Sequence, residues 1–388
     1  MAFFTDEQRG IIAMMYPSHS EEYNALLESF GTFVEKEILP AAPIVDKRSI
    51  FPRESIGKIF EYGFTNIAFP EDVGGLGLPF PIYLACMELV AKACASTAIS
   101  LAIHGTVCDG IFRFGNKDQH EKYLRPLILG HKLAAFGLTE ASGGSDARAM
   151  TSRASLIDDE WHLDGEKMFI TNSGEADYYF VFAKTEKGFV SIIVPKEASG
   201  VSIGKNIEKM GLKGSRLAEL AFSGVKVPRE NIVGTDGQGF EYAKGMLQGG
   251  RITVAAISVG IAQIALEKSV AYAQMRSAFG KKLSDFEITR AKLAEMKTEI
   301  DSARLMTYYA GYLKAEGKDY ASQASEAKLY STEMALRVCN ECIQIHGGFG
   351  YTDEADVHRH WRDAKLMTIG EGTSEIMKLL ISNQLLKS

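Results

Sequence analysis

The segment 369–376 places a carboxylate, Glu371, between two glycines and directly before an apolar helical pattern. Thr373 is well placed to cap that helix, because a threonine hydroxyl at the N-cap accepts a backbone hydrogen bond. Partial burial against an apolar face raises the pKa of a carboxyl toward neutrality, which suits a general base. The segment therefore predicts either a catalytic base at Glu371 or an acid that only caps the helix.

Two glycine-rich segments could bring backbone close to a ligand. Residues 137–146 combine small residues with the hydroxyls of Thr139 and Ser145, which can meet polar ring atoms or a phosphate. In residues 344–351, three glycines follow a helical stretch and leave bare backbone at its end. The alternatives are a plain polar loop for the first segment and simple helix termination for the second.

An aromatic ring and a hydroxyl stand together at Phe169 and Thr171, after a strand-like run. Such a pair could wall a flat ring system, although a buried phenylalanine at a strand end is the commoner arrangement. His346, taken alone, is expected to be a satisfied core histidine.

The elements that must position these residues follow the order helices, sheet, helices. Residues 20–130 show helical periodicity, and the apolar segment 82–114 predicts one or two buried helices. From about 133 to 235 β-prone runs dominate, and Asp164 with Gly165 predicts a hairpin turn between two of them. We expect a helical domain over 1–130, a β domain over 131–235 and a second helical domain over 236–388.

Charge and composition exclude several classes of protein. The 388 residues include 43 Lys and Arg against 49 Asp and Glu, and the formal charge of −6 disfavours nucleic acid as a partner. Five cysteines within apolar stretches indicate reduced thiols, and no signal peptide or membrane span is evident, so we expect a cytoplasmic protein. Cys339 and Cys342 have the spacing of half a zinc site, but no second pair follows, so no metal is expected. No Gly-x-Gly-x-x-Gly motif follows a strand, which disfavours a nicotinamide cofactor.

These segments, in this order and spacing, resemble the acyl-CoA dehydrogenase family over essentially the whole chain. Residues 137–149 and 344–363 each resemble one of the two signature patterns of the family, and residues 276–281 resemble its Arg-x-x-Phe-Gly-Lys segment. The resemblance implies an α+β fold with an N-terminal helical domain, a central β domain and a C-terminal four-helix bundle. It also implies FAD as cofactor and a homotetramer, or a dimer, as the assembly.

The resemblance also implies roles for individual residues. Around the flavin and the start of the CoA site it places Phe136, Leu138, Thr139 and Ser145, with Phe169, Ile170 and Thr171 over the ring and Thr373 and Ser374 near the base. The adenosine diphosphate half of FAD would be held, partly across a subunit boundary, by Arg276, Phe279, Gln344, Gly347 and Gly348. Substrate contacts would come from Ser145, Gln248, Arg251 and Gly372.

The implied reaction is α,β-dehydrogenation of an acyl-CoA thioester, a step of β-oxidation, with electrons passed to electron-transferring flavoprotein. Glu371 would take the α-proton while the flavin takes the β-hydride. Some branches of the family carry the base immediately before the arginine that matches Arg251, but that position is Gly250 here. Glu371 is therefore the only base consistent with either arrangement.

Several departures from the family pattern bear on the substrate. Gly370 replaces the tyrosine common before the base in short- and medium-chain members, which leaves room for a branched or cyclic acyl group. Residues 96–100 lack the arginine that glutaryl-CoA dehydrogenases use, so a dicarboxylic substrate is disfavoured. Gln248 and Glu287 also differ from the usual residues, which puts those single contacts in doubt. Asp109 lies within the apolar stretch expected to face the acyl pocket, so it must be paired, exposed or functional.

Two other functions compete with dehydrogenation. A flavin oxidase or monooxygenase could use the same scaffold, but the oxidases are usually much longer and the monooxygenases generally lack the base. A non-catalytic scaffold protein could lose the glycine-rich loops and Glu371 without penalty, and this chain keeps them.

Overall fold

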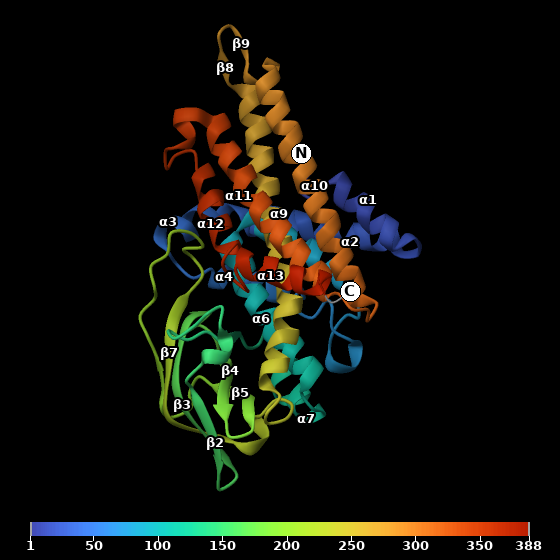
Figure 1. Cartoon of the computed structure of the whole chain (residues 1–388). Helices are drawn as coiled ribbons and strands as arrows, with labels where there is room; N and C mark the ends of the chain where they lie inside the picture. Colours follow the sequence, from blue (N-terminus) through green and yellow to red (C-terminus); the bar gives the residue numbers. More distant parts are fainter. Residues whose placement is uncertain (1, 387–388) are drawn as a thin grey trace.

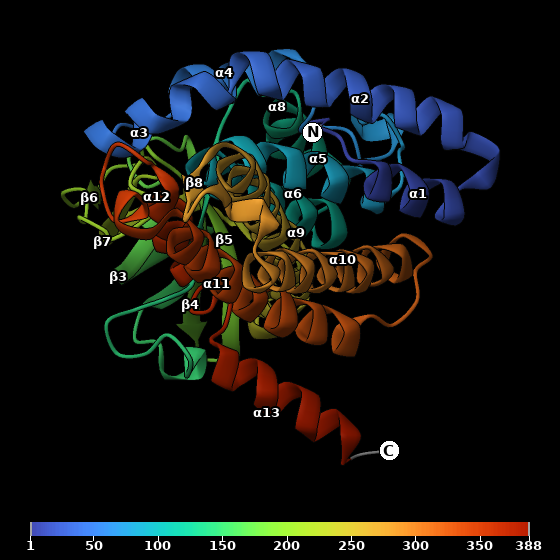
Figure 2. The same cartoon turned by 90° about the horizontal axis from the view of Figure 1, so that it is seen from above.

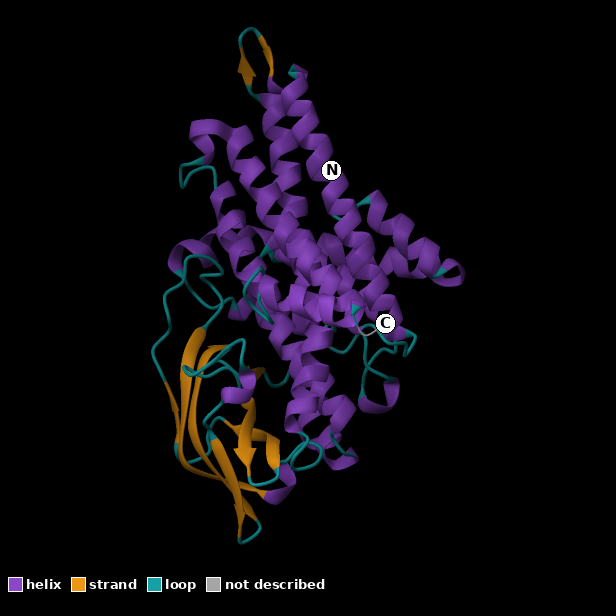
Figure 3. Ribbon diagram, in the orientation of Figure 1, coloured by secondary structure: helices purple, strands orange, loops and turns teal. Residues whose placement is uncertain are grey.

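Strands fill the middle of the chain and helices the two ends, as Figures 1 and 3 show for residues 2–386, which the computed structural model describes. The sheet lies beside one end of the long helices, and a small hairpin stands at their opposite end (Figure 1). This order confirms the predicted α+β architecture.

The N-terminal part contains α1 Asp6–Met15, α2 Ser20–Glu37, α3 Ala42–Arg48, α4 Arg53–Glu61, α5 Phe80–Ala93, α6 Ala95–Phe114, α7 Lys117–Gln119 and α8 Arg125–Ile128. The apolar segment 82–114, predicted as one or two buried helices, forms α5 and α6. In α2, Leu27, Phe30 and Val34 are buried, because positions three and four apart share one helix face.

The sheet consists of β1 Ala134–Gly137, β2 Arg153–Ile157, β3 Glu160–Thr171, β4 Tyr178–Thr185, β5 Gly188–Pro195, β6 Val201–Ile203 and β7 Leu217–Pro228. The strands run in the order β1-β4-β2-β3-β7-β6, and β5 pairs with β4. Phe180 and Phe182 share one face of β4 and join the apolar cluster that includes Val107 of α6 and Met246. This cluster fixes the sheet against the helices that form the cavity described below.

The hairpin turn predicted at Asp164 and Gly165 is wrong. The turn between β2 and β3 falls at Asp158 and Asp159, whose φ angles of 48° and 65° are left-handed. Strand β3 continues through Asp164, and Gly165 marks a register shift against β7. A Cβ on Gly165 would collide with Ser152. A glycine at a bulge and a glycine in a turn look alike in a sequence.

The C-terminal part contains α9 Gly239–Met275, α10 Glu287–Ala315, α11 Ala321–Gly350, α12 Val357–Met367 and α13 Ser374–Leu385, with the hairpin strands β8 Ser277–Ala278 and β9 Lys281–Lys282. Helices α9, α10 and α11 pack against one another, α12 packs on α9 and α11, and α13 packs on α11 (Figure 2). Gly347 kinks α11 with a φ of 60°. The predicted limits at 130 and 235 fall between α8 and β1 and between β7 and α9.

Helices α6 and α9 are long and apolar enough to cross a membrane by length and composition alone. However, 78% and 94% of their apolar stretches are buried inside the protein. Their composition therefore suits their place as central packing helices.

A buried ion pair joins α5 to α10. Arg304 is fully buried and donates hydrogen bonds to both carboxylate oxygens of Glu88, and the Tyr308 hydroxyl donates to the same carboxylate at 2.9 Å. Burial alone would lower the pKa of Arg304, but the Glu88 carboxylate raises it above its ordinary value. The pair holds α5, which lines the cavity, against the C-terminal helices.

Candidate active site

Glu371 lies on a bend between α12 and α13, where its φ is 53° and that of Gly372 is 106°. A left-handed backbone is unfavourable for a residue with a Cβ, and such strain clusters at functional sites. Thr373 caps α13 as predicted, because its hydroxyl accepts a hydrogen bond from the Ile376 N–H at 3.3 Å. The Ser374 hydroxyl donates to Glu333 of α11 at 2.6 Å, which fixes the other side of the bend.

The Glu371 carboxylate points at the backbone of α9. A Cβ built on Gly250 would come within 2.8 Å of Glu371 Oε1, so only glycine leaves room for the carboxylate. Glu371 Oε2 is buried and accepts no hydrogen bond from any residue in 2–386. Burial raises the pKa of Glu371 to about 7, although the cations of Arg251 and Lys328 oppose the rise. The group is therefore poised to take up a proton near neutral pH.

Two cationic side chains, one from α9 and one from α11, bind the backbone of the bend that carries Glu371. Arg251 Nε of α9 donates to the Glu371 carbonyl at 3.5 Å, and Lys328 Nζ of α11 donates to the Gly372 carbonyl at 2.6 Å. Burial lowers the pKa of Lys328 to about 8. None of the sequence motifs predicts a role for Lys328, but the local pattern contains a signal: Lys328 shares a helix face with the buried residues Ala324, Ser331 and Ala335, where a charged side chain is unusual.

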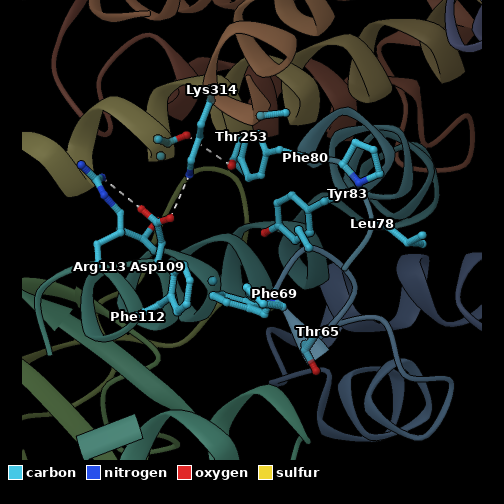
Figure 4. Close-up of a pocket in the computed structure, with 18 of the residues that line it drawn as sticks. Thr65, Phe69, Leu78, Phe80, Tyr83, Asp109, Phe112, Arg113, Thr253 and Lys314 are labelled. Carbon is cyan, nitrogen blue, oxygen red and sulfur yellow. Dashed lines mark hydrogen bonds and ion pairs between the residues drawn. The ribbon is translucent and has the colours of Figure 1, made fainter. Parts of the chain in front are cut away.

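A cavity of about 610 Å³ opens beside this carboxylate. Gly249 and Gly250 of α9 form part of one wall, and aromatic rings supply much of the rest: Phe64, Phe69, Phe80, Tyr83 and Phe112. The last four rings are labelled in Figure 4. Asp109, Arg113 and Lys314 form a polar region of the same wall (Figure 4). Pockets of 300–1,000 Å³ with mostly apolar walls suit small-molecule ligands. Gln248, one of the predicted substrate contacts, is half-buried and precedes Gly249, which lines the cavity.

The glycine-rich loop after β1 is anchored by a buried ion pair. Lys167 Nζ donates to Glu140 at 2.6 Å, and the Thr151 and Ser152 amides donate to the same carboxylate. Burial opposes ionisation, yet these bonds lower the pKa of Glu140 to about 2. Thr139 is half-buried and Ser145 is exposed, so both hydroxyls remain accessible. Sequence reasoning missed this pair, although Glu140 lies within the predicted segment 137–146 and Lys167 lies two residues before Phe169.

The residues near β3 fit a large flat cofactor. The Met168 N–H donates to the Thr139 carbonyl at 2.8 Å, which joins the two predicted segments. Phe169 keeps a left-handed φ of 58° with 54% of the residue exposed. An exposed aromatic ring on unfavourable backbone fits a ligand face rather than a core position. Ile170 is buried in the core, so only its backbone can meet a ligand, and the same holds for Leu138. Phe136 packs against Phe182, and Thr171 ends the strand.

The second predicted set gathers at the far end of the bundle, away from the sheet (Figure 1). Tyr272, one turn before Arg276, stacks on His346, which is a core histidine as expected. Phe279 is 97% exposed with a φ of 50°, and Gln344, Gly347 and Gly348 are also exposed. Within one chain these residues lie apart from the bend between α12 and α13 that carries Glu371 (Figure 1). All the predicted cofactor and substrate contacts stay predictions.

Helices, sheet and helices around a buried carboxylate are the arrangement of an acyl-CoA dehydrogenase. Three domain models of that family match the chain: the N-terminal domain over residues 20–131, the middle domain over 135–225 and the C-terminal domain over 237–386. The chain belongs to the acyl-CoA dehydrogenase family.

Two curated relatives cover almost the whole chain. The probable acyl-CoA dehydrogenase YngJ of Bacillus subtilis is 42% identical over 95% of this chain and 99% of its own length. The mitochondrial short-chain specific acyl-CoA dehydrogenase of Homo sapiens is 39% identical over 95% of this chain and 91% of its own length. The protein is thus an oxidoreductase of this family.

Solved structures of related proteins have the same fold as this chain. Butyryl-CoA dehydrogenase from Megasphaera elsdenii has a TM-score of 0.91 at 39% identity over 98% of both chains. A chain from work on the electron transferring flavoprotein of Acidaminococcus fermentans has a TM-score of 0.92 at 38% identity over 100% of both chains. A glutaryl-CoA dehydrogenase from Mycobacterium smegmatis in complex with FADH2 has a TM-score of 0.90 at 26% identity over 95% of both chains. FAD is the cofactor, as predicted.

Proposed function

We propose that the protein dehydrogenates a short-chain acyl-CoA thioester between its α and β carbons, with Glu371 as the base that takes the α-proton. One observation carries this proposal: Oε2 of Glu371 is buried without a hydrogen-bond donor among residues 2–386, and the carboxylate lies against Gly250 beside a cavity of suitable size. The butyryl-CoA and short-chain specific relatives support a short acyl chain.

The residues around Glu371 support proton abstraction in three ways. A pKa of about 7 leaves much of the carboxyl ionised at neutral pH, yet basic enough to hold a proton. The Glu371 N–H makes no hydrogen bond within residues 2–386, so it is free to donate to the thioester oxygen as negative charge develops there. Arg251 and Lys328 bind the carbonyls of the bend and hold the base in place. When bound, FAD supplies the acceptor for the hydride of the β-carbon.

Further parts of the proposal concern partners and substrate range. Electrons would pass to electron-transferring flavoprotein, and at least two subunits would share each FAD, because the second set of contacts lies at the far end of the bundle. All five cysteines are buried and free, which supports a reducing, cytoplasmic location.

Gly370 gives room near the base, since a Cβ there would meet only Leu366, at 3.6 Å. Branched and cyclic acyl groups therefore belong in the substrate panel.

The test is anaerobic reduction of the bound flavin, followed in the visible spectrum, by butyryl-, isobutyryl-, cyclohexanecarbonyl- and glutaryl-CoA. We expect bleaching by one of the first three, formation of the 2-enoyl-CoA, and loss of both in Glu371→Gln. Glu375→Gln, on the exposed first turn of α13, is the matched control. Bleaching that persists in Glu371→Gln would refute the base, and rapid reoxidation by air would favour an oxidase.

A further inference from the structure

The acyl cavity contains an ion pair that the dehydrogenation itself does not use. Asp109 of α6 accepts a hydrogen bond from Lys314 of α10 at 3.0 Å through Oδ1, and Arg113 lies 3.3 Å from Oδ2 (Figure 4). Lys314 also sits 4.0 Å above the centre of the Phe80 ring. Asp109 is therefore paired, one of the three alternatives that the sequence left open.

This pair lies close to the reacting end of the substrate. A Cβ on Gly249 would come within 2.9 Å of Lys314 Nζ, just as one on Gly250 would meet Glu371. Because neighbouring Cα atoms are about 3.8 Å apart, Lys314 Nζ and the Glu371 carboxylate are separated by no more than about 13 Å. Lys314 and Glu371 therefore flank neighbouring residues of α9, and a substrate whose α-carbon meets Glu371 can extend its acyl chain along the wall that carries the pair.

The hydrogen-bonding capacity of the pair is only partly filled. An ammonium has three donors and a carboxylate about four acceptor sites. Within residues 2–386, Lys314 Nζ donates one hydrogen bond and Asp109 accepts two. The side chains of Lys314 and Asp109 keep 14% and 18% exposure, which they have through the cavity wall. The Tyr83 hydroxyl points into the same cavity (Figure 4).

From this arrangement we propose that the acyl group of the substrate carries a hydroxyl at its far end, bound between Lys314 Nζ and the Asp109 carboxylate. The inference rests on the proposed function, since it places the thioester end at Glu371. A hydroxyl both donates and accepts, so it fills one free site on each partner.

Other chain ends suit the pair less well. A methyl group would remove water from two charges and return no hydrogen bond. An ammonium would face the two cations Lys314 and Arg113. A carboxylate would be attracted by those two cations but would compete with the Asp109 carboxylate, which already pairs with both of them. A site built to hydrogen-bond a substrate hydroxyl rejects the analogue that lacks it more strongly than an apolar pocket rejects a size change.

The test compares acyl-CoA thioesters of equal length that differ only at the chain end. Butanoyl-, pentanoyl- and hexanoyl-CoA are each paired with the ω-hydroxy derivative, and adipoyl- and ω-aminohexanoyl-CoA supply the two charged ends. Dissociation constants are measured by calorimetry on the FAD-loaded Glu371→Gln protein, in which the thioester stays unreacted. Anaerobic flavin reduction of the unmodified protein by the same compounds supplies the second readout.

Two double variants make the comparison specific. Asp109→Leu/Lys314→Met removes the pair together, which avoids leaving one buried charge unpaired. Glu241→Gln/Lys244→Met removes an exposed pair from the same helix as Gly249, with 55% and 49% side-chain exposure.

We expect at least one ω-hydroxyacyl-CoA to bind about 10-fold to 100-fold more tightly than its plain partner. This preference should fall to about 1 in Asp109→Leu/Lys314→Met and persist in Glu241→Gln/Lys244→Met. Three results would overturn the inference. The first is equal binding of the two thioesters in every pair, and the second is tighter binding of adipoyl- or ω-aminohexanoyl-CoA. The third is a preference for the hydroxyl that stays unchanged in Asp109→Leu/Lys314→Met. If no thioester reduced the flavin while the hydroxyl preference in binding held, the proposed reaction would fail and the hydroxyl site would stand.

Discussion

Replacing Glu371 with glutamine should stabilise the folded protein relative to the unmodified chain, by an amount that grows as the pH rises. In the folded protein, burial raises the pKa of Glu371 to about 7 from an ordinary value of 4.5. A carboxyl whose folded pKa lies above its unfolded value favours folding most below the unfolded pKa, and this contribution is lost as the pH rises through the folded pKa. Glutamine does not ionise and escapes the loss.

The size of the effect follows from the two pKa values. One pKa unit corresponds to about 1.4 kcal/mol, so ionised Glu371 costs the folded state about 3 kcal/mol above roughly pH 7. About 1 kcal/mol of this cost is already present at about pH 5. Between about pH 5 and about pH 8, the free energy of unfolding of Glu371→Gln should therefore rise by about 2–3 kcal/mol relative to that of the unmodified protein. For a chain of this length that is roughly 3 °C in melting temperature.

The assay is thermal unfolding of the FAD-loaded protein at fixed protein concentration and at several pH values in this range. Glu35→Gln, on the exposed side of α2, controls for the loss of one negative charge. The measured quantity is the difference in melting temperature between variant and unmodified protein, and its slope with pH. A difference that stays constant, or that shrinks as the pH rises, would show that Glu371 is not the buried, desolvated acid described above.

Two further predictions concern the charges that surround the site. The rate of flavin reduction should rise with pH, with a midpoint near the Glu371 pKa of about 7. Lys328→Met should move this midpoint up by about one pH unit, because the change removes a cation that lowers the pKa of Glu371. It also removes the hydrogen bond to the Gly372 carbonyl. Stopped-flow rates across the pH range would check this, and an unmoved midpoint would contradict it. Glu88→Gln should destabilise the protein by about 3–5 kcal/mol, because Arg304 is left buried without its carboxylate, and Glu88→Leu/Arg304→Met should recover part of the loss. Denaturant unfolding would check this, and a loss below about 1 kcal/mol would speak against the ion pair.

The parts of the site that depend on local sequence were predictable. Glu371 and Thr373 are set by a bend and a helix cap within a few residues, and the cap forms as expected. Buried helix over 82–114 follows from an apolar run with helical periodicity, although the run left open whether one or two helices form. Asp164 and Gly165 misled the prediction because β-prone runs flank them on both sides, as they would flank a turn.

The parts that depend on distant residues could not be predicted in the same way. Asp109 drew attention as a charge in an apolar stretch, but its partner Lys314 is 205 positions away. Glu88 and Arg304 are 216 positions apart, and nothing in either helix specifies which charge it meets. Phe169 takes a left-handed backbone without being glycine, because the ladder between β3 and β7 shifts register there. Such features come from tertiary packing, which a local pattern does not contain.

The central claim is that a carboxylate at the position of the Glu371 side chain takes the α-proton of the substrate. Gly250 faces that carboxylate, so a glutamate at 250 could occupy the same space once Glu371 is removed. The decisive measurement is the anaerobic rate of flavin reduction, by the thioester that reduces the unmodified protein fastest, in the unmodified protein, Glu371→Gly and Gly250→Glu/Glu371→Gly. We predict a loss of at least about 100-fold in Glu371→Gly and a measurable recovery in the double variant. A Glu371→Gly protein that reduces its flavin as fast as the unmodified protein would contradict the claim.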